Sequence, residues 1–314
     1  MSFETIDPKA ADLIARLGTP RPVTPDQLPN ARRQHVAIRL PQRAAKEEVD
    51  SVTVHPKLAD GVGVISIRPK GAGDSVLPAL VYLHGGGWTY GSFETYEPLC
   101  RQLANALRRV VVFVDYRLAP EHPFPAGLED SWTGFDWVCD NAATLRIDAR
   151  HIGIAGDSSG GNFAAVTALA ARSGIVRQMP DVQILLYPCV DLTGSQPSHQ
   201  SLGEGYMLTG EMYRWFARNY AGTFPDLKDW HLSPLFAEDV SGLPPTIIVY
   251  AGFDPLRDEA VAYANRLKGH GVKVQTIYFP RQIHGFMTMG GVFPDVAIGL
   301  QRITEALQQL DMRN

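Results

Sequence analysis

The feature that most constrains the fold of this chain is an alternation of short, almost wholly apolar segments with longer amphipathic ones. A strand that is apolar at nearly every position must be buried on both faces, and intervening helices supply the crossovers of a parallel sheet. We therefore predict an α/β fold with a mostly parallel, eight-stranded sheet flanked by helices. Two early β-rich runs, KEEVDSVTVH and GVGVISIRP, are typical of a hairpin; the other predicted strands are 78–85, 109–116, 151–156, 181–188, 245–252 and 272–279, and the predicted helices are 95–107, 127–145, 159–173, 256–270 and 294–310.

Two segments lie outside this alternation. Residues 1–45 have a helical pattern with several prolines, and 190–243 separates two predicted strands by far more than a crossover helix requires. Because the sites of α/β proteins lie at the carboxyl ends of their strands, a long insertion there is a candidate lid. We predict N-terminal cap helices in 1–45, an α/β core in 46–189 and 244–314, and a cap insertion in 190–243. The alternative for the insertion is an extra packing layer without a functional role.

Composition excludes several classes of partner. The formal net charge of −4 and the lack of a long basic run argue against nucleic acid and anionic membranes as partners. The N-terminus carries early acids instead of a basic segment before a long apolar core, and nowhere do 18 apolar residues run together, which predicts a cytoplasmic protein. Cys100, Cys139 and Cys189 are odd in number and far apart. We expect reduced thiols, and neither a disulfide framework nor a metal site.

The segment GDSSGG at 156–161 joins an apolar run, HIGIAG, to a helical one, NFAAVTALAAR. Ser158, with Gly156 and Gly160 two residues to either side, has the spacing of a nucleophile elbow, a strained strand-to-helix turn that exposes the serine hydroxyl. An ordinary glycine-rich turn is the alternative, because the same spacing also arises by chance. The nucleophile elbow requires a base, an acid and oxyanion donors elsewhere in the chain, whereas an ordinary turn requires none of them.

A nucleophilic serine needs a base, and in elbow-type hydrolases the order along the chain is serine, acid, histidine. His284 is the favoured base because it directly follows the last predicted strand, and Gly285 lets the backbone bend there. His270 falls at the end of a predicted helix, a position that accounts for a histidine without a catalytic role. His199 and His231 fall inside the 190–243 insertion. The histidines that follow Ser158 are His199, His231, His270 and His284.

The orienting acid is expected after the preceding strand, where Asp254 stands nearest to the strand end and before Pro255. A helix N-cap would explain this aspartate equally well. Asp258 in the same segment is the second candidate, and Asp191 after an earlier strand is the third.

A glycine-rich turn, HGGGW at 84–88, directly follows another predicted strand. Its unshielded amides predict an oxyanion hole in which Gly85 and Gly86 donate together with the amide of Ser159. We expect His84 and Trp88 to shape this loop and to wall the substrate pocket. A merely flexible turn is the alternative.

Five segments in this order resemble the bacterial hormone-sensitive-lipase-type carboxylesterases: HGGGW, DYRLAPEHPFPA at 115–126, GDSSGG, DPLRDE at 254–259 and HGF at 284–286. The resemblance covers roughly residue 45 onward. It implies an α/β-hydrolase fold with a helical cap, a triad of Ser158, His284 and Asp254, and no metal or organic cofactor. It also implies a polar network of Asp115, Arg117 and Glu121 beneath the HGGG loop. Ser159 departs from the alanine that the family usually has there, which leaves its amide unchanged.

The resemblance implies hydrolysis of short-to-medium acyl esters, with a small-molecule ester as substrate and an acyl-serine intermediate. An amidase or deacetylase on the same fold is the alternative, and a non-catalytic receptor is disfavoured because His284 is present. An apolar edge strand at 272–279 is a candidate homodimer interface. The predicted pocket residues are Trp88, Asp157, Tyr187, Tyr206, Met207, Trp215 and Phe286. Tyr213 and Phe216 are further candidates for an apolar acyl site.

Overall fold

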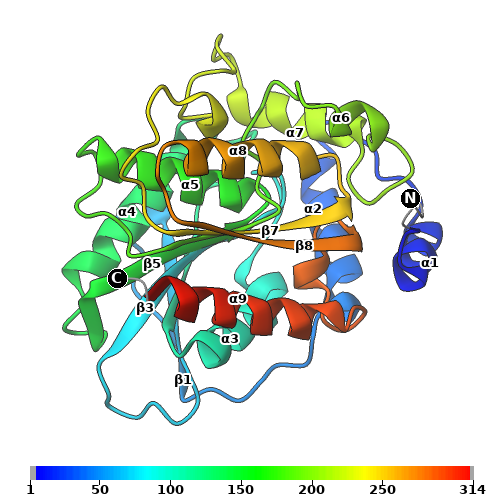
Figure 1. Cartoon of the computed structure of the whole chain (residues 1–314). Helices are drawn as coiled ribbons and strands as arrows, with labels where there is room; N and C mark the ends of the chain where they lie inside the picture. The colour runs from blue at the N-terminus through cyan, green and yellow to red at the C-terminus, as the bar shows by residue number, and fades with distance from the viewer. Residues whose placement is uncertain (1–4, 312–314) are drawn as a thin grey trace.

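A computed structural model describes residues 5–311 of the chain, which form an eight-stranded sheet between layers of helices (Figure 1). The spatial order of the strands is β1-β2-β4-β3-β5-β6-β7-β8. The pairs β1–β2 and β2–β4 are antiparallel, and every other neighbouring pair is parallel. The predicted α/β fold, mostly parallel sheet and early hairpin are therefore confirmed. The strands are β1 (Ser51–Val54), β2 (Gly63–Arg68), β3 (Leu77–Leu83), β4 (Val110–Asp115), β5 (Ile147–Asp157), β6 (Gln183–Leu186), β7 (Thr246–Phe253) and β8 (Val274–Ile283).

Two apolar cores cover the two faces of the sheet. On β3, the side chains of Ala79, Val81 and Leu83 contribute to one core and those of Leu80 and Tyr82 to the other, as the period of two in a strand requires. Three helices cover the first face, namely α4 (Ala126–Asp140), α5 (Ser159–Arg172) and α8 (Arg257–Gly269). The second face is covered by α3 (Phe93–Leu107) and α9 (Asp295–Asp311).

The two segments outside the alternation contain helices joined by irregular chain, and both are attached to loops at the carboxyl ends of the strands. The 1–45 segment contains α1 (Pro8–Leu17), α2 (Leu28–Arg39) and η1 (Leu40–Gln42), and 190–243 contains α6 (Ser198–Ser201), α7 (Gly210–Ala221) and η3 (Pro234–Phe236). From α2, Arg32 Nε donates to the carbonyl of Thr89 at 2.9 Å. In α7, the carbonyl of Tyr220 accepts from the amide of Phe124 at 2.7 Å. The other short elements are η2 (Ala59–Gly61) and η4 (Phe286–Thr288).

The polar residues of the DYRLAPEHPFPA segment bind partners outside that segment. Arg117 forms an ion pair with Asp130 of α4, where Nη2 and Oδ1 are 2.6 Å apart. Glu121 pairs with Arg32 through two hydrogen bonds of 2.7 Å. Support for the HGGG loop therefore comes in part from α2, because Arg32 joins Glu121 to the Thr89 carbonyl just past that loop.

The topology brings four chain segments to one edge of the sheet. The strands β3, β5, β7 and β8 are linked through parallel pairings, so their carboxyl ends point the same way. The residues that follow these strands are His84, Ser158, Asp254 and His284. Among the described residues, no helix is both long and apolar enough to cross a membrane.

Candidate active site

Ser158 lies in a strained turn between β5 and α5. Its φ of 53° and ψ of −118° fall in a region that residues with side chains rarely adopt. The turn is possible because two neighbours lack side chains: a Cβ on Gly156 would meet the carbonyl oxygen of Gly160 at 2.2 Å, and one on Gly160 would meet that of Leu83 at 2.0 Å. The Ser158 amide is held by the carbonyl of Leu186 at 2.9 Å. Both glycines are therefore required for the close packing of this turn.

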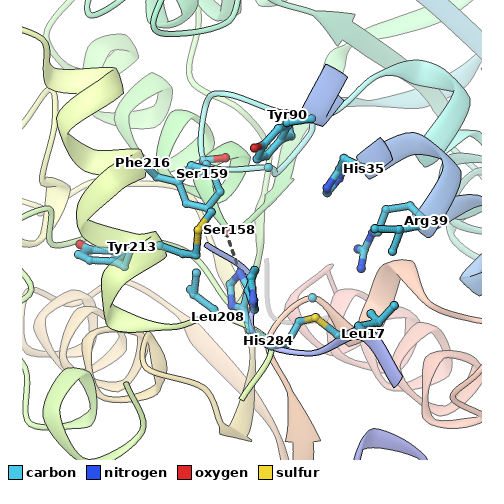
Figure 2. A pocket seen from close by; sticks show the side chains of 18 of the residues that line it. Leu17, His35, Arg39, Tyr90, Ser158, Ser159, Leu208, Tyr213, Phe216 and His284 are labelled. Carbon is cyan, nitrogen blue, oxygen red and sulfur yellow. Dashed lines mark hydrogen bonds between the residues drawn. The ribbon is translucent and has the colours of Figure 1, made fainter. Parts of the chain in front are cut away.

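Two hydrogen bonds join Ser158, His284 and Asp254 (Figure 2 shows the first). The Oγ atom of Ser158 lies 2.9 Å from Nε2 of His284, and Nδ1 of His284 lies 2.8 Å from Oδ2 of Asp254. Asp254 is fully buried, and its other oxygen accepts from the amide of Leu256 at 2.8 Å. With a proton on Nδ1 donated to the carboxylate, Nε2 is free to accept the proton of the serine hydroxyl.

The competing acids and bases have other partners. Asp191 is a loop acid whose oxygens accept from Thr193 and Ser195, and Asp258 pairs with Arg257 at 2.8 Å. His199 binds Glu259, His231 binds Asp229, and His270 binds the carbonyl of Arg266 at the end of α8. Of these candidates, only Asp254 and His284 meet at Ser158.

The HGGG loop does not present its amides as the sequence suggested. The Gly85 amide donates to Oδ1 of Asp157 at 2.8 Å and is therefore engaged within the protein. The next two glycines line the cavity beside Ser158 and Ser159, whereas Gly85 does not. The candidate oxyanion donors thus shift by one residue, from Gly85 and Gly86 to Gly86 and Gly87. Ser159 keeps its place at the start of α5.

Asp157 anchors the loop from below. It is 2% exposed, and besides the Gly85 amide it accepts from the hydroxyls of Tyr82 at 2.9 Å and Tyr96 at 3.1 Å. Burial raises the pKa of this carboxyl, and the hydrogen bonds from Tyr82 and Gly85 partly oppose that rise. His84 is also buried, its ring stacks on Tyr116 at 4.1 Å, and desolvation lowers its pKa. A buried, stacked ring fits the shaping role expected for His84.

A cavity of about 360 Å³ opens above Ser158. Trp88, Asp157 and Met207 line it as predicted, and so do Tyr213 and Phe216. Four predicted pocket residues do not line it: Tyr187, Tyr206, Trp215 and Phe286.

Each of these four side chains packs elsewhere. The fully buried Tyr187 ring lies 5.0 Å from that of His284, and Phe286, also fully buried, packs on Tyr187 at 5.9 Å. Trp215 packs beside Phe216 and Tyr90. Tyr206 lies against Phe253 at 5.3 Å. Tyr187 and Phe286 therefore support the histidine from behind the cavity wall.

Sequence reasoning missed the part of the wall that comes from the N-terminal segment. Leu17 of α1 and His35 and Arg39 of α2 face the cavity (Figure 2). His35 stacks on Tyr90 with ring centres 4.8 Å apart, and burial lowers its pKa to about 3, so the ring is neutral at pH 7. The four-residue spacing of His35 and Arg39 put them on one face of a helix, but nothing in the sequence said what that face met.

The chain is similar to known proteins over most of its length. Residues 80–288 match the model of a family described as having the alpha/beta hydrolase fold. An ethyl acetate hydrolase of Pseudomonas putida is 39% identical over 74% of this chain and 73% of its own. The carboxylesterase NlhH of Mycobacterium tuberculosis is 40% identical over 80% of each chain. A solved structure, the hyperthermophilic esterase of the archaeon Pyrobaculum calidifontis, superposes with a TM-score of 0.88 at 35% identity, covering 98% of this chain and 99% of its own.

These likenesses agree with the segments that carried the resemblance in the sequence. HGGGW, GDSSGG and DPLRDE all fall within the matched residues 80–288. The chain belongs to the α/β-hydrolase fold family and, within it, to the hormone-sensitive-lipase-type carboxylesterases.

Proposed function

We propose that this carboxylic ester hydrolase cleaves its substrates through an acyl intermediate on Ser158. The observation that carries the proposal is the pair of hydrogen bonds from Ser158 to His284 and from His284 to Asp254. His284 takes the hydroxyl proton as Ser158 attacks the ester carbonyl, and it then gives that proton to the departing alkoxide. Water repeats these steps to release the acid. Asp254 keeps the imidazole in the required tautomer throughout.

The developing oxyanion is assigned to the amides of Gly86, Gly87 and Ser159, which lie beside Ser158 in the cavity. Such donors act most strongly on charge that appears only in the transition state. Because Asp157 fixes the neighbouring Gly85 amide, the loop is held in place before substrate arrives. The proposed triad and donors consist entirely of side chains and amides of this chain, so the mechanism uses no cofactor.

The segments 1–45 and 190–243 are proposed to form the cap over the core 46–189 and 244–314. Side chains from both segments line the cavity, including Leu17 and His35 from the first and Leu208, Tyr213 and Phe216 from the second. A cavity of about 360 Å³ with these apolar walls fits esters with short-to-medium acyl chains.

Ser158→Ala tests the proposal, with Ser201→Ala as its matched control. Ser201 is an exposed serine in α6, and its hydroxyl is bound to the carbonyl of Pro197. We expect Ser158→Ala to lower kcat for 4-nitrophenyl butyrate by about 10⁶-fold and Ser201→Ala to leave it unchanged. Full activity in Ser158→Ala would overturn the mechanism. Faster cleavage of 4-nitrobutyranilide than of the ester by the wild-type protein would favour the amidase alternative.

A homodimer through β8 is a further proposal. This strand is at an edge of the sheet, paired only with β7 among the described strands, and Tyr278 on it is 37% exposed. Light scattering coupled to size-exclusion chromatography measures the mass directly. A monomeric mass at micromolar concentration would contradict it.

A further inference from the structure

The cavity above Ser158 carries positive charge that no carboxylate neutralises. Arg39 and Arg21 line it, and among the side chains that the structure describes no carboxylate oxygen lies within 4 Å of either guanidinium. The only acid in the lining is Asp157, whose oxygens already accept three hydrogen bonds. Burial holds the pKa of His35 far below neutrality, so this ring adds no charge at pH 7. Of the two, Arg21 is exposed and Arg39 is half-buried, so Arg39 contributes the less screened positive charge to the cavity.

Arg39 is held beside the base by neutral groups only. Its guanidinium donates to Oε1 of Gln42 at 3.3 Å and to the hydroxyl of Thr288. Thr288 in turn donates to the carbonyl of Gly285, the residue after His284, at 2.8 Å. Two of the five N–H donors of a guanidinium are used in this way. The remaining donors are available to a ligand, and Figure 2 shows the head group of Arg39 directed toward His284 across the cavity.

Gln42 supplies a second donor at the same place. It is 5% exposed and lines the cavity, and its amide oxygen accepts from Arg39. Its amide nitrogen has no hydrogen-bond partner among the described residues, because no described group accepts from it. An amide donor that lines the cavity and has no protein partner is available to a ligand. A cation and an N–H donor side by side match the two oxygens of a carboxylate.

On the basis of the proposed esterase function, we propose that Arg39 and Gln42 bind a carboxylate on the leaving group of the ester. The reason for the leaving group is geometric. His284 delivers its proton to the departing oxygen, so the alcohol part of the substrate must lie next to His284, and Arg39 is anchored to the loop that follows this histidine. The substrate class is therefore esters of hydroxy acids, in which a free carboxylate stands a few bonds from the ester oxygen.

Matched ester pairs test this assignment. The first pair is 4-acetoxybenzoate and the neutral 4-acetoxybenzamide, which differ in charge on the leaving phenol. The second pair is methyl hydrogen succinate and methyl butanoate, which differ in charge on the acyl part. For each pair the measured quantity is the ratio of kcat/KM for the anionic ester to that for the neutral one, in the wild type, Arg39→Gln, Arg39→Lys and Arg33→Gln. Arg33 is the control, because it lies exposed on the same helix, outside the cavity lining, and binds Asn30.

We expect Arg39→Gln to lower the ratio for the acetoxy pair by about tenfold or more, the contribution of a charge-assisted hydrogen bond. The loss should fall mainly on KM of the anionic ester. Arg39→Lys should retain part of the ratio, since it keeps the charge without the planar fork. Arg33→Gln should leave the ratio unchanged.

A measurement on the wild-type protein alone covers the case in which the Arg39 variants do not fold. Benzoate should inhibit more strongly than benzamide, and raising the ionic strength should weaken only the benzoate inhibition. Equal inhibition by the two compounds at low salt would overturn the assignment.

The remaining outcomes separate the inference from the function on which it rests. Equal losses on both members of the acetoxy pair would show that Arg39 only supports the histidine loop, and a loss confined to the succinate pair would place the carboxylate on the acyl part. Either result overturns the inference while hydrolysis of the neutral esters upholds the esterase. A wild-type protein inactive toward both neutral esters would instead contradict the proposed function itself.

Discussion

The floor and the wall of the cavity are built in different ways. The floor consists of strand-end loops in which the backbone fixes each group: Ser158 sits at a positive φ, and the Gly85 amide is bound to a buried carboxylate. The wall consists of side chains from segments far apart in the sequence, such as Tyr90 and Phe216, whose rings meet edge to face at 5.7 Å. Figure 2 shows both, with Tyr90 and Phe216 drawn above Ser158 and His284.

The floor therefore determines catalysis, and the wall determines which substrates are accepted. A floor position such as Gly160 has no room for even one additional carbon atom, because a Cβ there would overlap the backbone of β3. A wall position contributes surface area, and side chains of similar size can replace one another at modest cost. Changes in the floor should therefore affect kcat by orders of magnitude, and changes in the wall should redistribute KM among substrates.

The largest effect after loss of the nucleophile is expected for Asp254→Asn. The amide would hydrogen-bond the wrong tautomer of His284, leaving Nε2 protonated and unable to accept from Ser158. We expect kcat to fall by about 10³- to 10⁴-fold with little change in KM. Steady-state kinetics with 4-nitrophenyl butyrate measures this. The matched control is Asp258→Asn, at the rejected acid, and an equal loss there would contradict the assignment of Asp254.

A smaller loss is expected for Gly86→Ala, which tests the reassigned oxyanion loop. Gly86 has a φ of +117°, and a Cβ would meet the carbonyl of Tyr90 at 2.3 Å, so the loop must move away from Ser158. Loss of one donor lowers kcat by about 10²- to 10³-fold. Gly205→Ala is the control, with a φ of +83° but no atom within 4 Å of its Cβ. If both variants lost kcat equally, backbone strain rather than donor position would be the cause.

The floor could be predicted from sequence because its determinants are local. The helix after the serine was expected at 159–173 and runs from Ser159 to Arg172, since apolar pattern and glycine spacing act within a few residues. The convergence of Asp254 and His284 followed from the chain order serine, acid, histidine and from the position of both residues directly after predicted strands. What the sequence did not reveal is that the Gly85 amide is taken by Asp157, 72 residues away.

The wall could not be predicted because its contacts join distant parts of the chain. Arg39 reaches Thr288, which is 249 positions later. Adjacent residues of α7 also differ in their surroundings. Phe216 lines the cavity, whereas Trp215 does not line it and packs against Tyr90. A helical pattern states which residues share a face, but the docking angle of the helix decides what that face covers.

Phe216→Ala should change substrate choice without removing activity. Its ring lines the cavity, and its removal leaves room for several methylene groups. We expect the acyl-chain optimum across a series of 4-nitrophenyl esters to move to longer chains, with kcat/KM for the acetate falling by about 3- to 10-fold. Tyr206→Ala is the control, because that ring packs on Phe253 outside the lining. An unchanged chain-length profile in Phe216→Ala would show that the acyl chain does not occupy this side of the cavity.

The smallest effect on activity is expected at a buried ion pair that joins the 190–243 segment to the core. His199 of α6 lies 2.7 Å from Glu259 of α8, a carboxylate that also accepts from the amide of Val190 at 2.6 Å. Burial raises the pKa of Glu259 to about 7. Burial alone would lower the pKa of His199, but its hydrogen bond to Glu259 outweighs that and raises it. The folded pair thus holds protons more tightly than the unfolded chain does.

That tighter binding fixes the sign of a pH effect on stability. The raised pKa of His199 adds to the free energy of unfolding. This stabilisation is present in full below the ordinary histidine pKa of 6.5 and is lost as pH rises through the raised pKa of the folded protein. The raised pKa of Glu259 acts in the same direction between its ordinary value and about 7. At pH 6 the wild type should exceed the double variant His199→Gln/Glu259→Gln in unfolding free energy by about 1–3 kcal/mol, and the difference should shrink toward pH 9 because the variant lacks both groups whose pKa is raised. Denaturant unfolding across this range measures it, with His270→Gln, at an exposed helix end, as the control. A difference that grew with pH would mean that the pair is held together by something other than a shared proton.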